Sequence, residues 1–336
     1  MKKTHLLLLV MVIAGLILTP SFASAKTVFK LGFGDPIDSD QGAFAKQFKY
    51  LMEGYTNGEV EIQLFPGSSL GTETEMLQNT RRGALDMSMV AVTNMTPFSK
   101  ELQLLTMPYV IQSMRDAVNI TTGALGQKFN NAAIKQAGVR ILGYTYSNFR
   151  HLTNSKREVK RMEDLKGLKI RVPQNKPMLE TYKAWGANAT PMAWPEVFTA
   201  LQQGVIDGQD NPHIVNYTMK FHEVQKHITE MHYIFSLQPL IIGEKYYQNL
   251  DPKIQDLLIR AGIEAQQFCM LFQVEESNKA RDAMISAGMT FNKLENEDKM
   301  IQLAKEKVWP QFYDQVGGKE ALESLIAELE KAKEGF

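Results

Sequence analysis

The chain has 336 residues, with 37 Lys and Arg against 37 Asp and Glu, so its formal charge at pH 7 is zero. These balanced and scattered charges exclude the large basic surface that a nucleic-acid partner requires. The length and the 44% hydrophobic content allow two globular lobes with sizeable cores. The single Cys269 excludes an internal disulfide, and its apolar surroundings, "EAQQFCMLFQ", predict a buried packing residue rather than a reactive thiol.

The N-terminus predicts a secretory signal peptide over residues 1–25. Lys2 and Lys3 precede an apolar run, residues 6–18, which is shorter than the roughly 20 residues that a membrane-spanning helix needs. The small residues that follow favour cleavage before Lys26 over retention as a membrane anchor. Cleavage removes two lysines and no acidic residue, so we expect a mature protein with a charge of −2, soluble in the periplasm.

Short apolar runs alternate with helical patterns along the first part of the chain. The predicted order is strand 28–34, helix 40–58, strand 59–66, helix 73–83 and strand 85–92. This alternation is typical of βαβ units around a largely parallel sheet, which places the chain in the α/β class. Beyond about residue 250 the pattern becomes almost wholly helical, with long amphipathic segments over 252–286 and 295–334.

Two segments of the chain share one pattern. Residues 75–86, "EMLQNTRRGALD", and 196–207, "EVFTALQQGVID", both lead from a glutamate through a helix to a glycine, two apolar residues and an aspartate. Gly83 and Gly204 suit helices that end in the left-handed conformation and turn directly into a buried strand. The pattern indicates either a duplicated α/β lobe or a common local arrangement used twice. Two such lobes facing each other would form a hinged clamp for a small solute.

The second of these segments contains residues that suit a ligand site. Pro195 fits the first turn of a helix, which leaves Trp194 at a loop where its ring could cover a ligand or pack into a core. Residues 205–206 are expected to enter the sheet and 207–212 to form a turn. In that turn the Asn211 amide could donate to a carboxylate or simply stabilise the turn.

Arg171 lies at the end of the predicted strand "LKIRV", at the edge of an α/β sheet where ligand crevices open. Its guanidinium fork can bind a carboxylate through two parallel hydrogen bonds, which a lysine cannot do. A surface salt bridge is the alternative. At equivalent edge positions in the first part of the chain, the sequence places Asp35, Glu73, Thr93 and Asn94. The acidic residues would accept hydrogen bonds from hydroxyl or amine groups, although Glu73 would also stabilise its helix N-terminus.

Much of the sequence resembles one known family. The stretch "LKGLKIRVPQNKPMLETYKAWGANATPMAWPEVFTALQQGVIDGQDNP", with "FRHLTN" before it and "FHEVQKHI" after it, is similar to the solute-binding component, of the dicarboxylate-binding type, of tripartite ATP-independent periplasmic (TRAP) transporters. The earlier "LFPGSSLGTETEMLQNTRRGALDMSMV" and "LLTMPYVI" resemble the first lobe of the same family. The resemblance implies a periplasmic-binding-protein type II fold: two α/β lobes, crossover strands and a long C-terminal helix spanning both. Lobe 1 would comprise 26–148 with about 237–276, and lobe 2 would comprise 149–236 with about 277–336.

The resemblance also implies a function and a site. Such a protein captures a small organic acid as its carboxylate and delivers it to the membrane permease subunits, which an ion gradient drives. It would act as a monomer, without cofactor, metal or catalytic residues. Arg171 matches the arginine that holds the ligand carboxylate, Arg150 a second arginine of the pocket or a structural ion pair, and Asn211 the pocket asparagine. Gln238 would lie at a second crossing between the lobes.

Other signals in the sequence are weak. "GFGDPI" lacks the third glycine of a dinucleotide-binding fingerprint, the histidines have no metal-ligand spacing, and no nucleophile motif is present. Two alternatives to transport stay open: a periplasmic sensor that uses the same clamp, and an exported enzyme in which Arg171 orients an organic acid and Asp210 performs acid–base chemistry. The sequence does not distinguish a C4-dicarboxylate, a uronate or other sugar acid, a hydroxy or aromatic acid, or a sulfonate.

Overall fold

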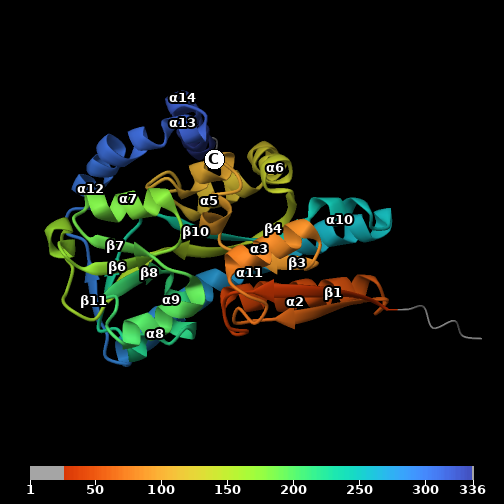
Figure 1. The fold of residues 1–336 in the computed structure, drawn as a ribbon, viewed down its shortest axis with the longest axis horizontal. Coiled ribbons are helices and arrows are strands. Elements are labelled where there is room, and N and C mark those ends of the chain that lie inside the picture. The colour runs from red at the N-terminus through yellow and green to blue at the C-terminus, as the bar shows by residue number, and fades with distance from the viewer. Residues whose placement is uncertain (1–25, 335–336) are drawn as a thin grey trace, which may run out of the picture.

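A computed structural model describes residues 26–334, so the predicted signal peptide over residues 1–25 lies outside the described part of the chain. The chain folds into two α/β lobes, each built around its own sheet, as predicted (Figure 1). In Figure 1, the sheet containing β1 and β3 lies to the right and the sheet containing β6, β7 and β8 to the left.

Lobe 1 is built on a five-stranded sheet in the order β2-β1-β3-β10-β4. Its strands are β1 (Thr27–Phe33), β2 (Val60–Phe65), β3 (Met87–Met89), β4 (Val139–Phe149) and β10 (Phe235–Gly243). β1 pairs in parallel with β2 and β3, whereas β10 is antiparallel to both β3 and β4. The predicted strands 28–34 and 59–66 are confirmed to within a residue. The predicted strand 85–92 is wrong at both ends, because β3 has three residues and Val92 begins a helix.

Lobe 2 is built on a six-stranded sheet in the order β11-β9-β5-β8-β6-β7. Its strands are β5 (His151–Asn154), β6 (Lys169–Val172), β7 (Asn188–Pro191), β8 (Gly208–Asn211), β9 (His227–Glu230) and β11 (Thr290–Lys293). The prediction for residues 205–212 was wrong, because 207–212 form no turn and β8 itself lies there. The strand occurs despite its polar residues, because their side chains are buried among hydrogen-bonding partners from other elements.

Two of the segments that connect the lobes lie side by side. One is Arg150, which separates β4 from β5, and the other is the segment 231–234 between β9 and β10. The backbone N–H of Arg150 donates to Ile234 O at 3.0 Å, and that of Tyr109 donates to Tyr233 O at 2.7 Å. The first hydrogen bond joins the two crossings, and the second ties the 231–234 crossing to the segment of the chain that contains Tyr109.

Helices cover both faces of the lobe-1 sheet. One face packs against α2 (Asp40–Tyr55) and α11 (Pro252–Ser286), and the other against α5 (Met114–Thr121) and α6 (Gly123–Ala132). The remaining lobe-1 segments are α3 (Glu73–Arg82), α4 (Val92–Met95), η1 (Glu101–Thr106), η2 (Ala133–Ala137) and α10 (Glu244–Gln248). Lobe 2 carries η3 (Met162–Leu165), α7 (Lys176–Ala184), η4 (Trp194–Glu196), α8 (Val197–Gln202), α9 (His213–Thr218) and η5 (Phe221–Glu223).

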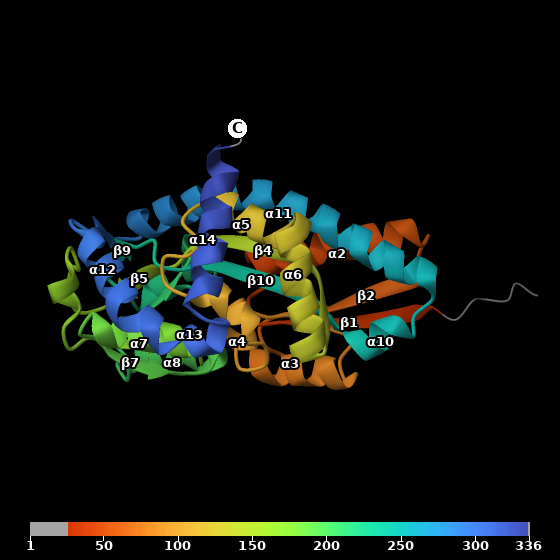
Figure 2. The same cartoon turned by 90° about the horizontal axis from the view of Figure 1, so that it is seen from above.

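Helix α11 crosses both lobes, and its predicted range of 252–286 is confirmed (Figure 2). It packs against α2 and β4 in lobe 1 and against α9 in lobe 2. Two glycines allow the close approach to β4: a Cβ added at Gly262 would lie 2.1 Å from Leu142 O, and one added at Gly143 would lie 2.5 Å from Gly262 O. Cys269 lies in the middle of the helix and is buried among lobe-1 core residues, as predicted.

The chain after β11 is less regular than the predicted helical segment 295–334. It forms α12 (Glu297–Leu303), η6 (Ala304–Val308), η7 (Trp309–Gln311), α13 (Tyr313–Val316) and α14 (Lys319–Glu334). Breaks occur at Pro310 and at Gly317 and Gly318, which both have positive φ. Residues from Val308 to Leu329 pack into an apolar cluster of lobe-1 residues. We therefore propose that this terminal part belongs with lobe 1, in place of the predicted assignment of 277–336 to lobe 2.

The two segments with a shared sequence pattern occupy equivalent places in the two lobes. Gly83 and Gly204 have φ of 77° and 70°, and each ends a helix just before a short strand. In lobe 1, Asp86 Oδ2 accepts from the Lys30 backbone N–H at 2.7 Å. In lobe 2, Asp207 Oδ2 accepts from the Lys169 backbone N–H at 2.9 Å. Each aspartate thus joins its segment to a lysine of the neighbouring parallel strand.

Candidate ligand-binding site

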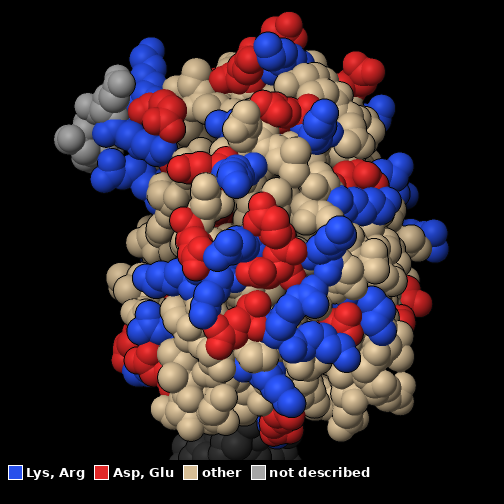
Figure 3. Space-filling model, turned by 90° about the vertical axis from the view of Figure 1, so that its left-hand side faces the viewer, with Lys and Arg blue, Asp and Glu red and all other residues tan. Residues whose placement is uncertain are grey.

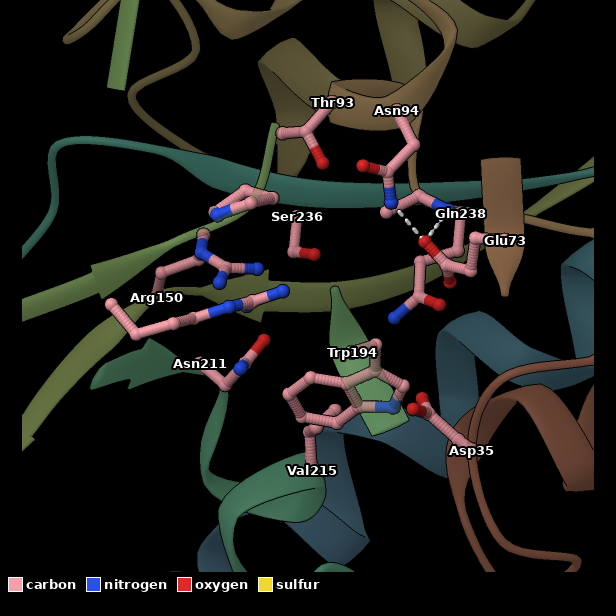
Figure 4. A pocket seen from close by; sticks show the side chains of 13 residues that line it. Asp35, Glu73, Thr93, Asn94, Arg150, Trp194, Asn211, Val215, Ser236 and Gln238 are labelled. Atoms are coloured by element: carbon pink, nitrogen blue, oxygen red, sulfur yellow. Dashed lines mark hydrogen bonds between the residues drawn. The ribbon is translucent and has the colours of Figure 1, made fainter. Parts of the chain in front are cut away.

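A cavity lies between the lobes, and all nine residues that the sequence singled out line it (Figure 4). The space free of protein atoms within the cavity and at its open mouth is about 360 Å³. Its walls come from both lobes and from both crossings. The predicted residues that line it are Asp35, Glu73, Thr93, Asn94, Arg150, Arg171, Trp194, Asn211 and Gln238, and the additional ones are Ala91, Pro173, Val215 and Ser236.

Arg171 projects from β6, and only 3% of its surface is exposed. Its Nε and Nη2 donate to Met192 O at 3.0 and 2.7 Å, and its Cζ lies 5.4 Å from the centre of the Trp194 ring. Among residues 26–334, no carboxylate forms an ion pair with Arg171. Burial, together with the nearby charge of Arg150, lowers the pKa of Arg171 to about 9. The guanidinium is therefore a buried positive charge without an anionic partner in the described part of the chain.

Arg150 is also buried, but it has a partner. Its Nε and Nη2 donate to Asp210 Oδ1 at 3.1 and 2.9 Å, and Nη2 also donates to Asp210 O. The Asp210 carboxylate accepts two further hydrogen bonds, from Tyr182 Oη at 3.1 Å and from Tyr233 Oη. Burial alone would lower the pKa of Arg150, but the Asp210 carboxylate raises it above its ordinary value. Arg150 thus forms the structural ion pair considered from sequence and still lines the cavity.

Asn211 ends β8, and its side chain faces the cavity (Figure 4). Its Nδ2 donates to Gln209 Oε1 at 2.7 Å, and its backbone O accepts from Asn216 Nδ2 at 2.7 Å. Gln209 is held in turn by Thr153 and Asn216. This network fixes the Asn211 side chain, so its position depends on the strand and on α9 rather than on a turn.

Lobe 1 contributes acidic groups to the opposite wall. Glu73 is the first residue of α3, and its Oε2 accepts from the Ala91 backbone N–H at 3.3 Å and from Asn94 Nδ2 (Figure 4). Burial raises the pKa of Glu73. Burial, and then the nearby carboxylates of Asp40 and Glu73, raise the pKa of Asp35 well above its usual range. The Asp35 backbone N–H donates to Gln41 Oε1 at 2.9 Å.

A buried polar network supports the crossing strand behind the cavity. Gln238 Nε2 donates to Ser147 Oγ at 2.9 Å, and Gln238 Oε1 accepts from Gln41 Nε2. Ser147 and Thr145 both donate to Asp40 Oδ2, Thr145 at 2.7 Å. Burial raises the pKa of Asp40. The network ties β4, β10 and α2 together, so the position of Gln238 is fixed by three elements.

Trp194 fills both roles that the sequence left open. Its ring packs against Phe221 in an edge-on contact at 5.8 Å and belongs to an apolar cluster of lobe 2. The same ring lines the cavity, and its Nε1 points toward Asp35 (Figure 4). Trp194 partly offsets the rise in the pKa of Asp35, although the two side chains make no hydrogen bond of good geometry.

Comparison with known proteins identifies the family of this chain. The family model described as bacterial extracellular solute-binding protein, family 7, matches residues 35–315. The chain belongs to this family. The resemblance to TRAP solute-binding components predicted from the sequence is thereby confirmed.

The family members most informative for this chain differ in their ligands. The 2,3-diketo-L-gulonate-binding periplasmic protein of Escherichia coli is 33% identical over 278 residues, 82% of this chain and 84% of its own. A TRAP periplasmic solute-binding protein from Polaromonas bound to D-erythronate has a TM-score of 0.83 and 30% identity, covering 90% of this chain and 98% of its own. A third, from Shewanella oneidensis with bound succinate, has a TM-score of 0.85 and 26% identity, covering 90% and 99%. All three are described as binding proteins.

Four lining residues were missed by the sequence analysis, and two of them carried a usable signal. Ser236 lies two residues before Gln238 on β10, and alternation along a strand places both on one face. Pro173 directly follows the strand that carries Arg171. Ala91 and Val215 gave no signal, because small apolar residues are common throughout the chain.

Within residues 26–334, no group of three or more His, Cys, Asp or Glu side chains is arranged to hold a metal ion. The helices of that region also include none that is long and apolar enough to cross a membrane. On the face of the molecule in Figure 3, lysines and arginines are interspersed with aspartates and glutamates.

Proposed function

We propose that this protein captures a small organic acid as its carboxylate between the two lobes and delivers it to the permease subunits of a TRAP transporter. Arg171 carries the proposal. A buried charge without a partner is costly, and an arginine offers the planar fork that a carboxylate fits. Bound acid would supply the missing negative charge, and Asn211 lies on the same wall to assist.

The relatives support an organic acid as the ligand. Those described above bind diketogulonate, erythronate and succinate, which differ in size and polarity but all carry a carboxylate. The remaining site residues form the rest of the contact surface in this proposal. We also propose that the protein is periplasmic and not an enzyme, which its relatives' descriptions as periplasmic binding proteins support. We further propose that it acts as a monomer.

Calorimetry tests capture directly. The protein is freed of endogenous ligand by unfolding and refolding, and it is then titrated with dicarboxylates, uronates, aldonates, hydroxy and aromatic acids, and sulfonates. One acid should bind per chain, and at about 100 times its dissociation constant it should stabilise the fold by roughly 2.7 kcal/mol. A correctly folded protein that binds none of these acids would contradict the proposal.

Uptake measurements separate transport from sensing. Membrane vesicles that contain the cognate permease should accumulate the labelled acid only when this protein and an ion gradient are both present. Binding without uptake would favour the sensor, and conversion of the acid during incubation would favour the enzyme. N-terminal sequencing of the secreted protein should begin at Lys26.

A further inference from the structure

The charges around the cavity limit the charge of its ligand. Two guanidinium groups line it, but the Arg150 charge is already balanced by Asp210 in a fully buried pair. Of these two arginines, Arg171 is the one that has no carboxylate partner among residues 26–334. The walls therefore offer one uncompensated positive charge. We infer that the ligand is a monocarboxylate whose remaining carbons carry hydroxyl groups, a sugar acid of the aldonate or uronate type; this inference rests on the proposed function.

The hydroxyl groups follow from polar atoms that the protein leaves without partners. In the described structure, three buried side-chain atoms of the cavity residues make no hydrogen bond: Asp35 Oδ2, Thr93 Oγ1 and Trp194 Nε1. The indole nitrogen can only donate, and the threonine hydroxyl can both donate and accept. Leaving such groups buried and unpaired costs free energy, so a matched ligand must supply both donors and acceptors. A hydroxyl group supplies both at once.

A second carboxylate does not fit the opposite wall. That wall contains Asp35 and Glu73, both buried, and among the described residues no arginine or lysine lines the cavity apart from Arg150 and Arg171. A carboxylate placed there would lose its water without gaining a cation, and unpaired buried charges are strongly disfavoured. An ammonium group would satisfy the carboxylates but would leave the Trp194 N–H unpaired, because it offers only donors.

The positions of these groups give the ligand an orientation. The carboxylate lies at Arg171 and Asn211 on the lobe-2 wall, and the hydroxylated carbons extend toward Asp35, Glu73 and the Trp194 ring edge. Gly34 makes room at that end, because a Cβ there would lie 3.2 Å from both Glu73 Oε1 and Trp194 Cδ1.

Calorimetry with ligands of one chain length tests the inference. The set contains six-carbon aldonates of different stereochemistry, the corresponding dicarboxylate glucarate, and adipate, hexanoate and 6-aminohexanoate. The best aldonate should bind about 30-fold more tightly, or better, than each of the other four, since each lacks hydroxyls or adds a charge. If adipate or glucarate binds within threefold of the best aldonate, the inference is wrong while capture of an acid stands. If no acid binds at all, the proposed function fails as well.

A matched pair of variants tests the hydroxyl contact. Asp35→Asn replaces the unpartnered carboxylate oxygen, and Asp38→Asn makes the same change at an exposed position that does not line the cavity. Asp35→Asn should weaken the best aldonate about tenfold and leave hexanoate unchanged, whereas Asp38→Asn should change neither. An equal loss for aldonate and hexanoate, or no loss, would remove Asp35 from hydroxyl recognition. Should Asp35→Asn not fold, the ligand set on the unaltered protein decides the inference alone.

Discussion

The two lobes use one βαβ arrangement to present opposite chemistry to the cavity. In each, an aspartate after the helix accepts a hydrogen bond from a lysine backbone N–H, Asp86 from Lys30 and Asp207 from Lys169. Two residues beyond that lysine, lobe 2 carries Arg171. Lobe 1 carries Gly32 there, and an added Cβ would lie 2.8 Å from Met76 Sδ. The repeated backbone therefore fixes positions, and packing in each lobe decides which of them can bear a functional side chain.

The helix starts differ in the same way. Lobe 1 begins α3 with Glu73, whereas lobe 2 begins the matching segment with Trp194 at η4. Lobe 1 thus contributes acids held by neutral donors, and lobe 2 contributes cations and an aromatic ring. A ligand that touches both walls must be negative at one end and hydroxylated at the other, which follows from the contrast and not from either lobe alone.

Arg171→Lys should have the largest effect, because it removes the feature that most distinguishes lobe 2 from lobe 1. The lysine keeps the charge but loses the fork, and we expect a loss of about 2 to 5 kcal/mol in binding, roughly 30-fold to several-thousand-fold. Calorimetry measures it, with Arg82→Lys on the exposed surface as the control.

The melting temperature of ligand-free Arg171→Lys separates a binding role from a structural one. Burial, and then the nearby charge of Arg150, lower the pKa of Arg171, so its charge does not stabilise the ligand-free fold. We therefore expect little change in the melting temperature. A collapsed melting temperature together with lost affinity would make Arg171 structural.

The equivalent aspartates test whether the shared arrangement is equally important in both lobes. Asp207 is 5% exposed and Asp86 is only partly buried, so Asp207→Ala should lower the free energy of unfolding by about 1.5 to 3 kcal/mol and Asp86→Ala by about 0.5 to 1.5. Urea unfolding measures both. An equal loss in the two variants would show that burial does not set the strength of this hydrogen bond. Neither aspartate lines the cavity, so the affinity of the folded variants should not change.

The lobes should also respond to acid with opposite signs. Burial, and then the nearby His213 and His232, lower the pKa of His151 in lobe 2 well below its usual range. The unfolded chain therefore binds more protons below about pH 6.5, and the contribution of His151 to stability is lost as the pH falls. In lobe 1 the buried carboxyls of Asp35, Asp40 and Glu73 have raised pKa values, so their contribution to stability grows as the pH falls through the window between their unfolded and folded pKa values.

A variant of His151 isolates the lobe-2 part. His151→Asn keeps an acceptor for the Met231 backbone N–H, which His151 Nδ1 accepts at 3.3 Å, but does not titrate. The stability of the unaltered protein relative to this variant should fall by up to about 1.4 kcal/mol per pH unit below pH 6.5. The pKa of His232 shifts in the opposite direction, because its hydrogen bond to Glu297 raises it. Since His232 is present in both proteins, its effect on stability cancels in the comparison. A difference that does not change with pH would contradict this account.

Trp194→Phe should have the smallest effect. It keeps a ring beside Arg171 but removes the buried N–H and weakens the cation–π contact, so affinity should fall by about 1 kcal/mol, roughly fivefold. Trp309→Phe is the matched control in lobe 1, because Lys305 lies 5.4 Å from its ring and its N–H donates to Pro108 O. The control should lower stability and leave affinity unchanged. If Trp194→Phe instead lowered stability and left affinity unchanged, Trp194 would be only a core residue.

Regular elements with strong patterns could be predicted from the sequence. Helix α11 and strands β1 and β2 were placed to within a residue, because apolar periodicity and clear end signals coincide there. Strand β8 was missed, because "GQDN" has no intrinsic preference for a strand. It depends on partners outside the strand, such as Arg150, 60 residues before Asp210, and Asn216 on α9. The C-terminal helices were predicted as one segment because their apolar pattern is continuous. The structure breaks that segment at Pro310 and at the glycine pair.

The site could be predicted mainly from residues that end strands or begin helices. Arg171, Glu73 and Asp35 were found in this way, and the resemblance added Arg150 and Asn211. The partner of Arg150 could not be found, because Asp210 lies 60 residues further along the chain and only the folded sheet brings the two together. The sequence therefore left an ion pair as the alternative for both arginines, and the structure realises it for Arg150 alone of the two among residues 26–334.

Because Cys269 is buried in the middle of α11, the rate at which its thiol is labelled measures local opening of that helix. The chain contains one cysteine, its side chain is 1% exposed, and burial raises the pKa of its thiol well above the usual range. A thiol reagent can therefore modify it only when α11 lifts from the lobe-1 sheet, and the rate of labelling counts those openings. Because no second thiol exists, that rate reports on a single point at the centre of the one helix that both lobes share.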